Sequence, residues 1–170
     1  MKNKRIQITR QLAKFSSTTK ALEDAGLTCE IRILKNEILE ANRYLSQKLQ
    51  VSLASPLIFF QRLRIVEGQP KTIETSYIPE ELVPGMEQVQ LNDRSFYQFL
   101  NDEYQIEIRK SEEEILLVKA SENEKRLLEL TDDEVLVLKG KTFDKSQRCI
   151  EYFEIAAVPD FYVFESGVSV

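Results

Sequence analysis

The strongest constraint on the fold is a β-hairpin pattern near the middle of the chain. Leu57 to Glu67 is rich in β-branched and aromatic residues, and Lys71 to Tyr77 forms a second strand pattern. Gly68-Gln69-Pro70 lies between them and is typical of a turn. The hairpin favours an antiparallel sheet over one built from regular βαβ units.

Other segments predict further strands and short helices around this hairpin. Strands are expected at Thr28 to Leu39, Ile106 to Val118, Val135 to Phe143, Cys149 to Val158 and Phe161 to Phe164. Helices are expected at Lys20 to Ala25, Asn42 to about Leu49, Ser95 to Tyr104, and Ser121 to Leu128 or Leu130. Asn92 or Asp93 could cap the third helix, and Ser121 with Glu124 forms a capping-box pattern. These elements together predict an α+β domain with a central antiparallel sheet and short helices packed on it.

Composition and charge exclude several classes of protein. The 170 residues fit one domain. The net charge of −5 does not favour a chain that binds DNA through its own surface. One basic run, Met1 to Lys14, contains no acidic residue. We interpret it as a connector to a neighbouring domain rather than as an arm that binds nucleic acid or membrane, because it is short and has no interleaved aromatic residues. No window resembles a signal peptide or a membrane span, so a cytoplasmic protein is expected.

The supply of reactive side chains is narrow. The sequence has no histidine, which excludes histidine-based acid/base catalysis and Ser-His triads. Cys29 and Cys149 are too few for a disulfide scaffold or a cysteine-only zinc site, and we expect both to be reduced and partly buried. The sequence also has no glycine-rich phosphate loop, and no cofactor or metal is expected.

Two arginines in the first hairpin strand are the best candidates for ligand chemistry. Side chains alternate along a strand, so Arg62 and Arg64 share one face. A three-residue connection would place Arg64 opposite Glu74 and Arg62 opposite Ser76. Two neighbouring guanidinium groups could bind a phosphate or carboxylate, or they could form ordinary exposed ion pairs with no function.

Other polar groups are less informative. The hydroxyl cluster Ser16 to Thr19 stands where a helix begins and could contact an anion, although N-capping needs only one of the four hydroxyls. Glu151 could enter a pocket and bind a hydroxyl or amine. The acidic triplet Glu112 to Glu114 is expected to be a solvated strand face or a bulge.

The chain resembles the effector-binding UTRA domain of GntR-type regulators, the branch named after HutC and FarR. The resemblance extends from about Leu12 to Phe164 and depends on the order and spacing of its landmarks. These are Phe15-Ser16-Ser17, Gly26-Leu27, Arg62-Leu63-Arg64-Ile65, Gly68-Gln69-Pro70, Glu74-Thr75-Ser76-Tyr77-Ile78-Pro79, Leu82-Val83-Pro84-Gly85, Ser95 to Leu100, Val135 to Leu138, Thr142-Phe143-Asp144, Ile150-Glu151-Tyr152 and Asp160 to Phe164.

The resemblance implies a chorismate-lyase-like fold and a homodimer that binds a small anionic metabolite, such as a phosphosugar. Ligand binding would change the placement of N-terminal winged-helix domains on DNA. The residues implied for the pocket are Arg62, Arg64, Glu74, Glu151, Ser16, Ser17, Ser95 and Tyr97.

The chain departs from the family pattern in two places. The usual pattern has an aromatic residue, typically Tyr, and then Arg-Gly where this chain has Ala157, Val158 and Pro159. We therefore expect the pocket to have lost a contact, so a hexose phosphate cannot be assumed. No winged helix precedes the first landmark, so residues 1–14 are expected to be a linker remnant and residues 15–170 the effector-binding domain.

The leading hypothesis is therefore a ligand-sensing and dimerisation domain that is not an enzyme, contacts DNA only through a separate domain and does not contact membrane. One alternative is a chorismate-lyase-like enzyme that acts on an anionic small molecule, although the chain offers no nucleophile–base pair for it. Another is a purely structural dimerisation module whose arginines form ordinary ion pairs.

Overall fold

The computed structural model describes residues 5–91 and 93–170. The strands are β1 (Ile8–Gln11), β2 (Cys29–Glu40), β3 (Pro56–Val66), β4 (Gln69–Pro79), β5 (Ile108–Lys119), β6 (Glu134–Asp144), β7 (Cys149–Ala157) and β8 (Tyr162–Glu165). The helices are α1 (Thr18–Asp24), α2 (Arg43–Leu49), α3 (Phe96–Tyr104) and α4 (Glu122–Leu128), and two 3-10 turns cover Glu80–Leu82 and Met86–Gln88. Every predicted helix and strand is present, with its ends within two residues of the expected positions.

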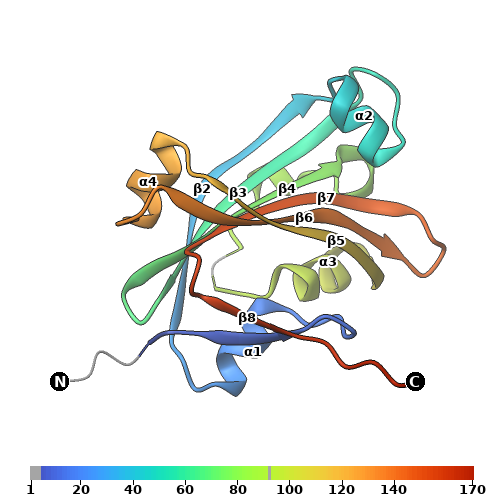
Figure 1. Ribbon diagram of the computed structural model, residues 1–170. Coiled ribbons are helices and arrows are strands. Elements are labelled where there is room, and N and C mark those ends of the chain that lie inside the picture. Colours follow the sequence, from blue (N-terminus) through green and yellow to red (C-terminus); the bar gives the residue numbers. More distant parts are fainter. Residues whose placement is uncertain (1–4, 92) are drawn as a thin grey trace.

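Six of the strands form one antiparallel sheet in the order β2-β3-β4-β7-β6-β5. The strands β1 and β8 form a separate parallel pair, which lies beside α1 at the end of the molecule away from α2 (Figure 1). The α+β class with a central antiparallel sheet is confirmed. The strand β1 was not predicted, and it lies inside the basic run that the sequence suggested was a connector.

The predicted turn of the central hairpin is wrong. The chain reverses at Glu67 and Gly68, both with positive φ (50° and 77°), and Val66 lies opposite Gln69. A two-residue turn with left-handed backbone matches the twist of the strands that it joins. Glycine adopts this backbone readily, but a glutamate there is not evident from the sequence.

The shorter turn changes the register of the two arginines. Arg62 lies opposite Glu74, where Ser76 was expected, and Arg64 lies opposite Thr72, where Glu74 was expected. An irregularity in the ladder follows directly after Arg64. Both arginines consequently lie within ion-pair distance of one glutamate, Glu74.

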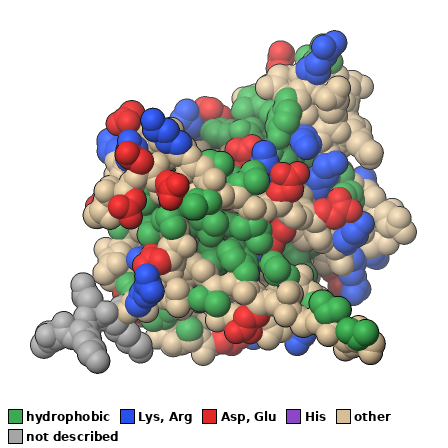
Figure 2. Space-filling view, viewed as in Figure 1, with side chains coloured by type: hydrophobic (Ala, Val, Ile, Leu, Met, Phe, Trp, Pro, Cys, Tyr) green, Lys and Arg blue, Asp and Glu red, His purple; other side chains and the backbone are tan. Residues whose placement is uncertain are grey.

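Hydrophobic side chains are not confined to the interior. On the face seen in Figure 2 they gather over the middle of the molecule, with Lys, Arg, Asp and Glu mainly around them. The edge strand β5 carries three exposed hydrophobic residues in succession, Leu116, Leu117 and Val118. No helix in the described ranges is both long and apolar enough to cross a membrane.

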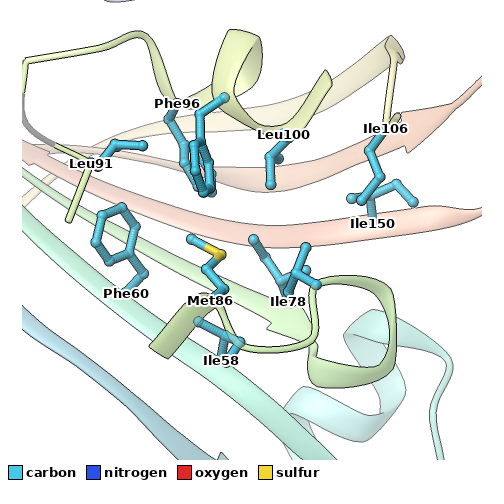
Figure 3. Close-up of a cluster of buried hydrophobic side chains, with 11 residues drawn as sticks. Ile58, Phe60, Ile78, Met86, Leu91, Phe96, Leu100, Ile106 and Ile150 are labelled. Carbon is cyan, nitrogen blue, oxygen red and sulfur yellow. The ribbon is translucent and has the colours of Figure 1, made fainter. Parts of the chain in front are cut away.

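The largest core cluster packs α3 and the 3-10 turns against the sheet (Figure 3). In α3, Phe96, Phe99 and Leu100 repeat at helical spacing and are buried. The ring of Phe96 lies 5.5 Å from that of Phe60 on β3. This packing places the first turn of α3 above the strand that carries both arginines.

Helix caps follow the sequence pattern at α2 and α4. The side chain of Asn42 accepts the backbone N–H of Leu45, and the capping box of Ser121 and Glu124 is present. For α3 the expectation is wrong at Asp93, because its carboxylate accepts the N–H of Ile31 instead and the cap position is Ser95. The other expected cap, Asn92, lies outside the described residues.

Candidate functional site

One cavity lies between the sheet and the first turns of α1 and α3, and β1 and β5 contribute to its wall. All eight residues that the sequence suggested for a pocket line this cavity: Arg62, Arg64, Glu74, Glu151, Ser16, Ser17, Ser95 and Tyr97. Its volume is about 60 Å³. A single water needs about 10–15 Å³ by a similar measure, so the space suits a group of about four to six small atoms.

The Arg64–Glu74 pair in the cavity wall is held by several hydrogen bonds. Nε and Nη2 of Arg64 donate to the two carboxylate oxygens of Glu74 at 2.8 and 3.1 Å, which is the bidentate geometry that guanidinium and carboxylate favour. Thr72 donates a further hydrogen bond to Glu74 at 3.0 Å. Burial alone would raise the pKa of Glu74, but the guanidinium of Arg64, helped by Arg62, outweighs it and lowers the pKa to about 2.

Arg62 is held in a different way, against two neighbouring aromatic rings. Its guanidinium carbon lies 4.9 Å from the centre of the Phe60 ring and 4.5 Å from that of Phe96. Its Nη2 donates to Ser76 at 3.3 Å and lies 3.6 Å from Glu74. Burial lowers the pKa of Arg62, against the opposing attraction of Glu74. Stacking fixes the plane of the guanidinium and leaves part of its donor fork uncommitted.

Glu151 lies on β7, the strand next to β4, and is the second buried carboxylate of the cavity wall. The hydroxyl of Tyr97 donates to it at 2.8 Å and that of Thr142 at 3.2 Å. Burial raises the pKa of Glu151, although these hydrogen bonds and Arg62 oppose the effect. Burial and the facing carboxylate raise the pKa of Tyr97 as well, so its hydroxyl keeps its proton.

The residues of the hydroxyl cluster, Ser16 to Thr19, have different roles: one caps a helix, and the others contact Arg64 or line the cavity. Ser17 caps α1 by accepting the N–H of Lys20 at 3.1 Å, as the sequence suggested for one of the four hydroxyls. Thr19 accepts a hydrogen bond from Nη1 of Arg64 at 3.3 Å. Ser16 and Thr18 line the cavity beside them.

Sequence reasoning missed several residues of the wall. Arg10 on β1 is the most important, because it brings a third guanidinium to the cavity. It belongs to the basic run, so its charge was visible, but the pairing of β1 with β8 that places it was not. The other missed residues of the wall are Phe15, Thr75, Ser76, Phe96, Ser111, Phe153 and Ile155, whereas Thr18 and Thr19 belong to the hydroxyl cluster that the sequence suggested.

Three other expectations can be placed in the structure. Ala157 is buried in a core cluster with Val66 and Phe161, and the Ala157–Pro159 segment is not part of the cavity wall. Cys29 is half-buried, Cys149 is buried and both are free thiols. Among the residues that the structure describes, there is no group of three or more acidic or thiol side chains that could hold a metal ion.

The acidic triplet of β5 is only partly solvated. Glu112 and Glu114 are exposed, whereas Glu113 is half-buried and forms an ion pair with Arg10 at 3.2 Å. The alternation of side chains along the strand explains the difference, since Glu113 shares its face with Ser111 in the cavity wall.

A model of the UTRA domain family matches residues 24–162, which is most of the chain and includes six of the eight predicted pocket residues. The chain belongs to the UTRA domain family. The resemblance inferred from the sequence landmarks is therefore confirmed.

Curated relatives of this UTRA domain are named as transcription regulators. The chain is 23% identical over 136 residues to the uncharacterized HTH-type transcriptional regulator YurK of Bacillus subtilis, covering 80% of this chain and 56% of YurK. It is 24% identical over 162 residues to MngR of Escherichia coli, a repressor of mannosyl-D-glycerate transport and metabolism, covering 95% of this chain and 67% of MngR. The UTRA domain therefore spans between about half and two thirds of the length of these two regulators.

Solved structures share the fold of this UTRA domain. The effector domain of PhnF from Mycobacterium smegmatis superposes with a TM-score of 0.86 at 21% identity, covering 96% of this chain and all of that one. A GntR-family transcriptional regulator from Bacillus cereus superposes with a TM-score of 0.72 at 22% identity, covering 83% of this chain and 99% of that one. Both structures confirm the arrangement of sheet and helices.

Proposed function

We propose that this UTRA domain is the effector-binding and dimerisation domain of a bacterial GntR-type transcription regulator. It binds a small anionic metabolite, a phosphosugar or a similar compound, and binding controls how a winged-helix domain outside these 170 residues contacts DNA. The relatives named as transcription regulators support the regulatory part of this proposal.

The observation that carries the proposal is the charge of the cavity wall. Arg10, Arg62 and Arg64 face two buried carboxylates, Glu74 and Glu151. Three guanidinium groups against two carboxylates give the wall itself an excess of positive charge, while Glu113 pairs with Arg10 from outside the wall. An anion that enters this space would compensate buried guanidinium groups that water cannot solvate well.

Dimerisation is supported by the exposed hydrophobic residues of the sheet. Leu116, Leu117 and Val118 lie on the edge strand β5, and such residues on an edge favour association with another chain. We keep residues 1–14 as the linker and residues 15–170 as the domain, with the addition that the linker packs on the domain from Ile6 onwards.

A binding role also fits the cavity better than catalysis does. The glutamates of the wall are held by hydrogen bonds to Arg64, Tyr97 and Thr142, which suits recognition rather than proton transfer. We therefore propose that the protein is a cytoplasmic regulator that needs no cofactor and is not an enzyme. Turnover of chorismate or a related enol ether by the purified chain would contradict this.

A thermal-shift screen tests the proposal directly. At about 100 times its dissociation constant, a ligand that binds only the folded state adds about 2.7 kcal/mol to the free energy of unfolding. For a domain of this size we expect the melting temperature to rise by about 5–10 °C. The screen should include sugar phosphates, amino sugars, nucleotides and organic acids.

The control variants are matched in chemistry. Arg62→Gln should remove the shift, and Arg5→Gln, at an exposed ion pair with Asp160, should preserve it. If no anionic class moved the transition and a neutral compound did, an anionic effector would be ruled out.

A further inference from the structure

The three arginines of the cavity differ in how far their donors are occupied. In Arg64 four of the five N–H groups are used, because Nε and Nη2 donate to Glu74 while Nη1 donates to Thr19 at 3.3 Å and to the Cys29 sulfur at 3.5 Å. In Arg62 the buried Nε finds no hydrogen-bond partner among the described residues, and in Arg10 the same is true of the buried Nη1. The buried guanidinium nitrogens of the wall that make no hydrogen bond to the described residues therefore belong to Arg62 and Arg10.

Arg10 contacts one acidic and one aromatic side chain at the cavity. Its Nη2 donates to the carboxylate of Glu113 on β5 at 3.2 Å, and its guanidinium carbon lies 5.7 Å from the centre of the Tyr162 ring. The side chains of Arg10 and Glu113 are 22% and 18% exposed, so solvent screens this pair less than a surface pair. Its Nη1 is buried and has no hydrogen-bond partner among the described residues.

We propose that Arg10 is a further ligand residue, beside Arg62, for an effector oxyanion of phosphate or sulfate size, and that Glu113 competes with this oxyanion for Arg10. This inference rests on the proposed function and names the contacts of the same site. Arg64 fixes Glu74 and Thr19 through its own hydrogen bonds, so most of its donors are committed before an anion binds.

The size of the cavity supports an oxyanion of this kind. Space for about four to six small atoms fits a phosphate or sulfate group with its oxygens. Arg62 has its plane fixed by the Phe60 and Phe96 rings, which suits a planar fork that donates to two oxygens. Ser16 and Ser111 line the same space and can donate hydroxyl hydrogens to the oxygens that remain.

The test is calorimetric titration of the full 170-residue chain with inorganic phosphate and, separately, with sulfate, at one fixed low salt concentration. Arg10→Gln should weaken the binding of both anions by about 10- to 100-fold, since a hydrogen bond to a charged group contributes about 1.5–3 kcal/mol. Glu113→Gln should strengthen it by about two- to fivefold, because the competing carboxylate is removed.

Two controls separate these effects from a general change of charge. Glu114→Gln makes the same substitution on the opposite face of β5 and should leave both affinities unchanged. Arg5→Gln removes an exposed arginine of the same segment and should also have no effect. Because Glu113→Gln acts in the direction of tighter binding, a folding defect could not imitate it.

The outcomes distinguish this inference from the proposed function. If the wild-type chain binds neither phosphate nor sulfate, or if Arg10→Gln and Glu113→Gln both bind like wild type, the inference is overturned. The proposed function is decided separately, by whether any anionic class raises the melting temperature of the wild-type protein.

Discussion

Glu74 and Glu151 are two buried glutamates of one cavity wall with opposite electrostatic surroundings. Glu74 lies between two guanidinium groups, and Arg64 forms a bidentate pair with it. Glu151 is held by hydroxyl groups, and burial raises its pKa where the arginines lower that of Glu74. The same residue type therefore has its pKa shifted in opposite directions at the two positions.

Replacing Glu74 should have a pH-dependent effect on stability. The folded-state pKa of about 2 lies below the ordinary 4.5, so the stabilisation from ionised Glu74 is complete above pH 4.5 and is lost as the pH falls towards 2. At pH 7, Glu74→Gln leaves Arg64 buried without its anion, and we expect a loss of about 3 kcal/mol in the free energy of unfolding. Urea unfolding at several pH values between 7 and 2.5 measures this loss.

The difference between Glu74→Gln and wild type should shrink steadily below pH 4.5. Glu114→Gln is the control, since its exposed carboxylate should change the stability by no more than about 0.5 kcal/mol at any of these pH values. A loss that stayed constant down to pH 2.5 would show that the Arg64–Glu74 charge pair is not its cause.

Local pattern predicted the elements well but not their pairing. The helices and strands that the sequence suggested are found within two residues of their expected ends, because alternation, helical spacing and caps are local properties. The strand order brings β4 beside β7, far along the chain, and no local pattern specifies that neighbour. The register of Arg62 was missed because Glu67 adopts a left-handed backbone that its residue type does not suggest.

The candidate site shows the same limit. Its eight predicted residues came from the family landmarks and from the strand face of the arginines, and all eight line one cavity. Arg10 was missed because four residues of a basic run carry too short a pattern to predict β1, whose place depends on β8 at the other end of the chain. Long-range pairing thus decided which part of the basic run reaches the site.

The packing of β1 can be tested at Ile8. Its side chain is buried, at 3% exposure, against Leu22 and Phe161. Ile8→Ala should lower the free energy of unfolding by about 2–4 kcal/mol through lost burial and a residual cavity. Leu53→Ala, at 68% exposure, is the matched control and should change it by less than about 0.5 kcal/mol. Equal values for the two variants in urea unfolding would mean that β1 does not pack on the domain in solution.

At the scale of the whole molecule, the cavity and the N-terminal strand share one residue. Arg10 lines the cavity through its side chain, while its backbone belongs to β1 and pairs with β8. An anion that binds Arg10 consequently stabilises β1 in its docked position. By thermodynamic linkage, a change in the docking of β1 must alter anion affinity by the same factor. This gives the segment preceding the domain a physical route to respond to the effector.

Hydrogen exchange can detect this coupling. The backbone N–H of Ile8 donates to the carbonyl of Phe161, just before β8, at 2.9 Å. That of Leu12 donates to the carbonyl of Glu165 in β8 at 2.8 Å. Exchange at these amides requires local opening of β1, so saturating inorganic phosphate should slow it in the wild-type chain. In Arg10→Gln, at phosphate concentrations that saturate that variant, the slowing should be absent.

The Ser46 amide of α2, which donates to Asn42 at 2.8 Å far from the cavity, should be unaffected in both proteins. If phosphate binds and the β1 amides exchange at their original rate, the site and the N-terminal strand are energetically independent, and another element must carry the response to the effector.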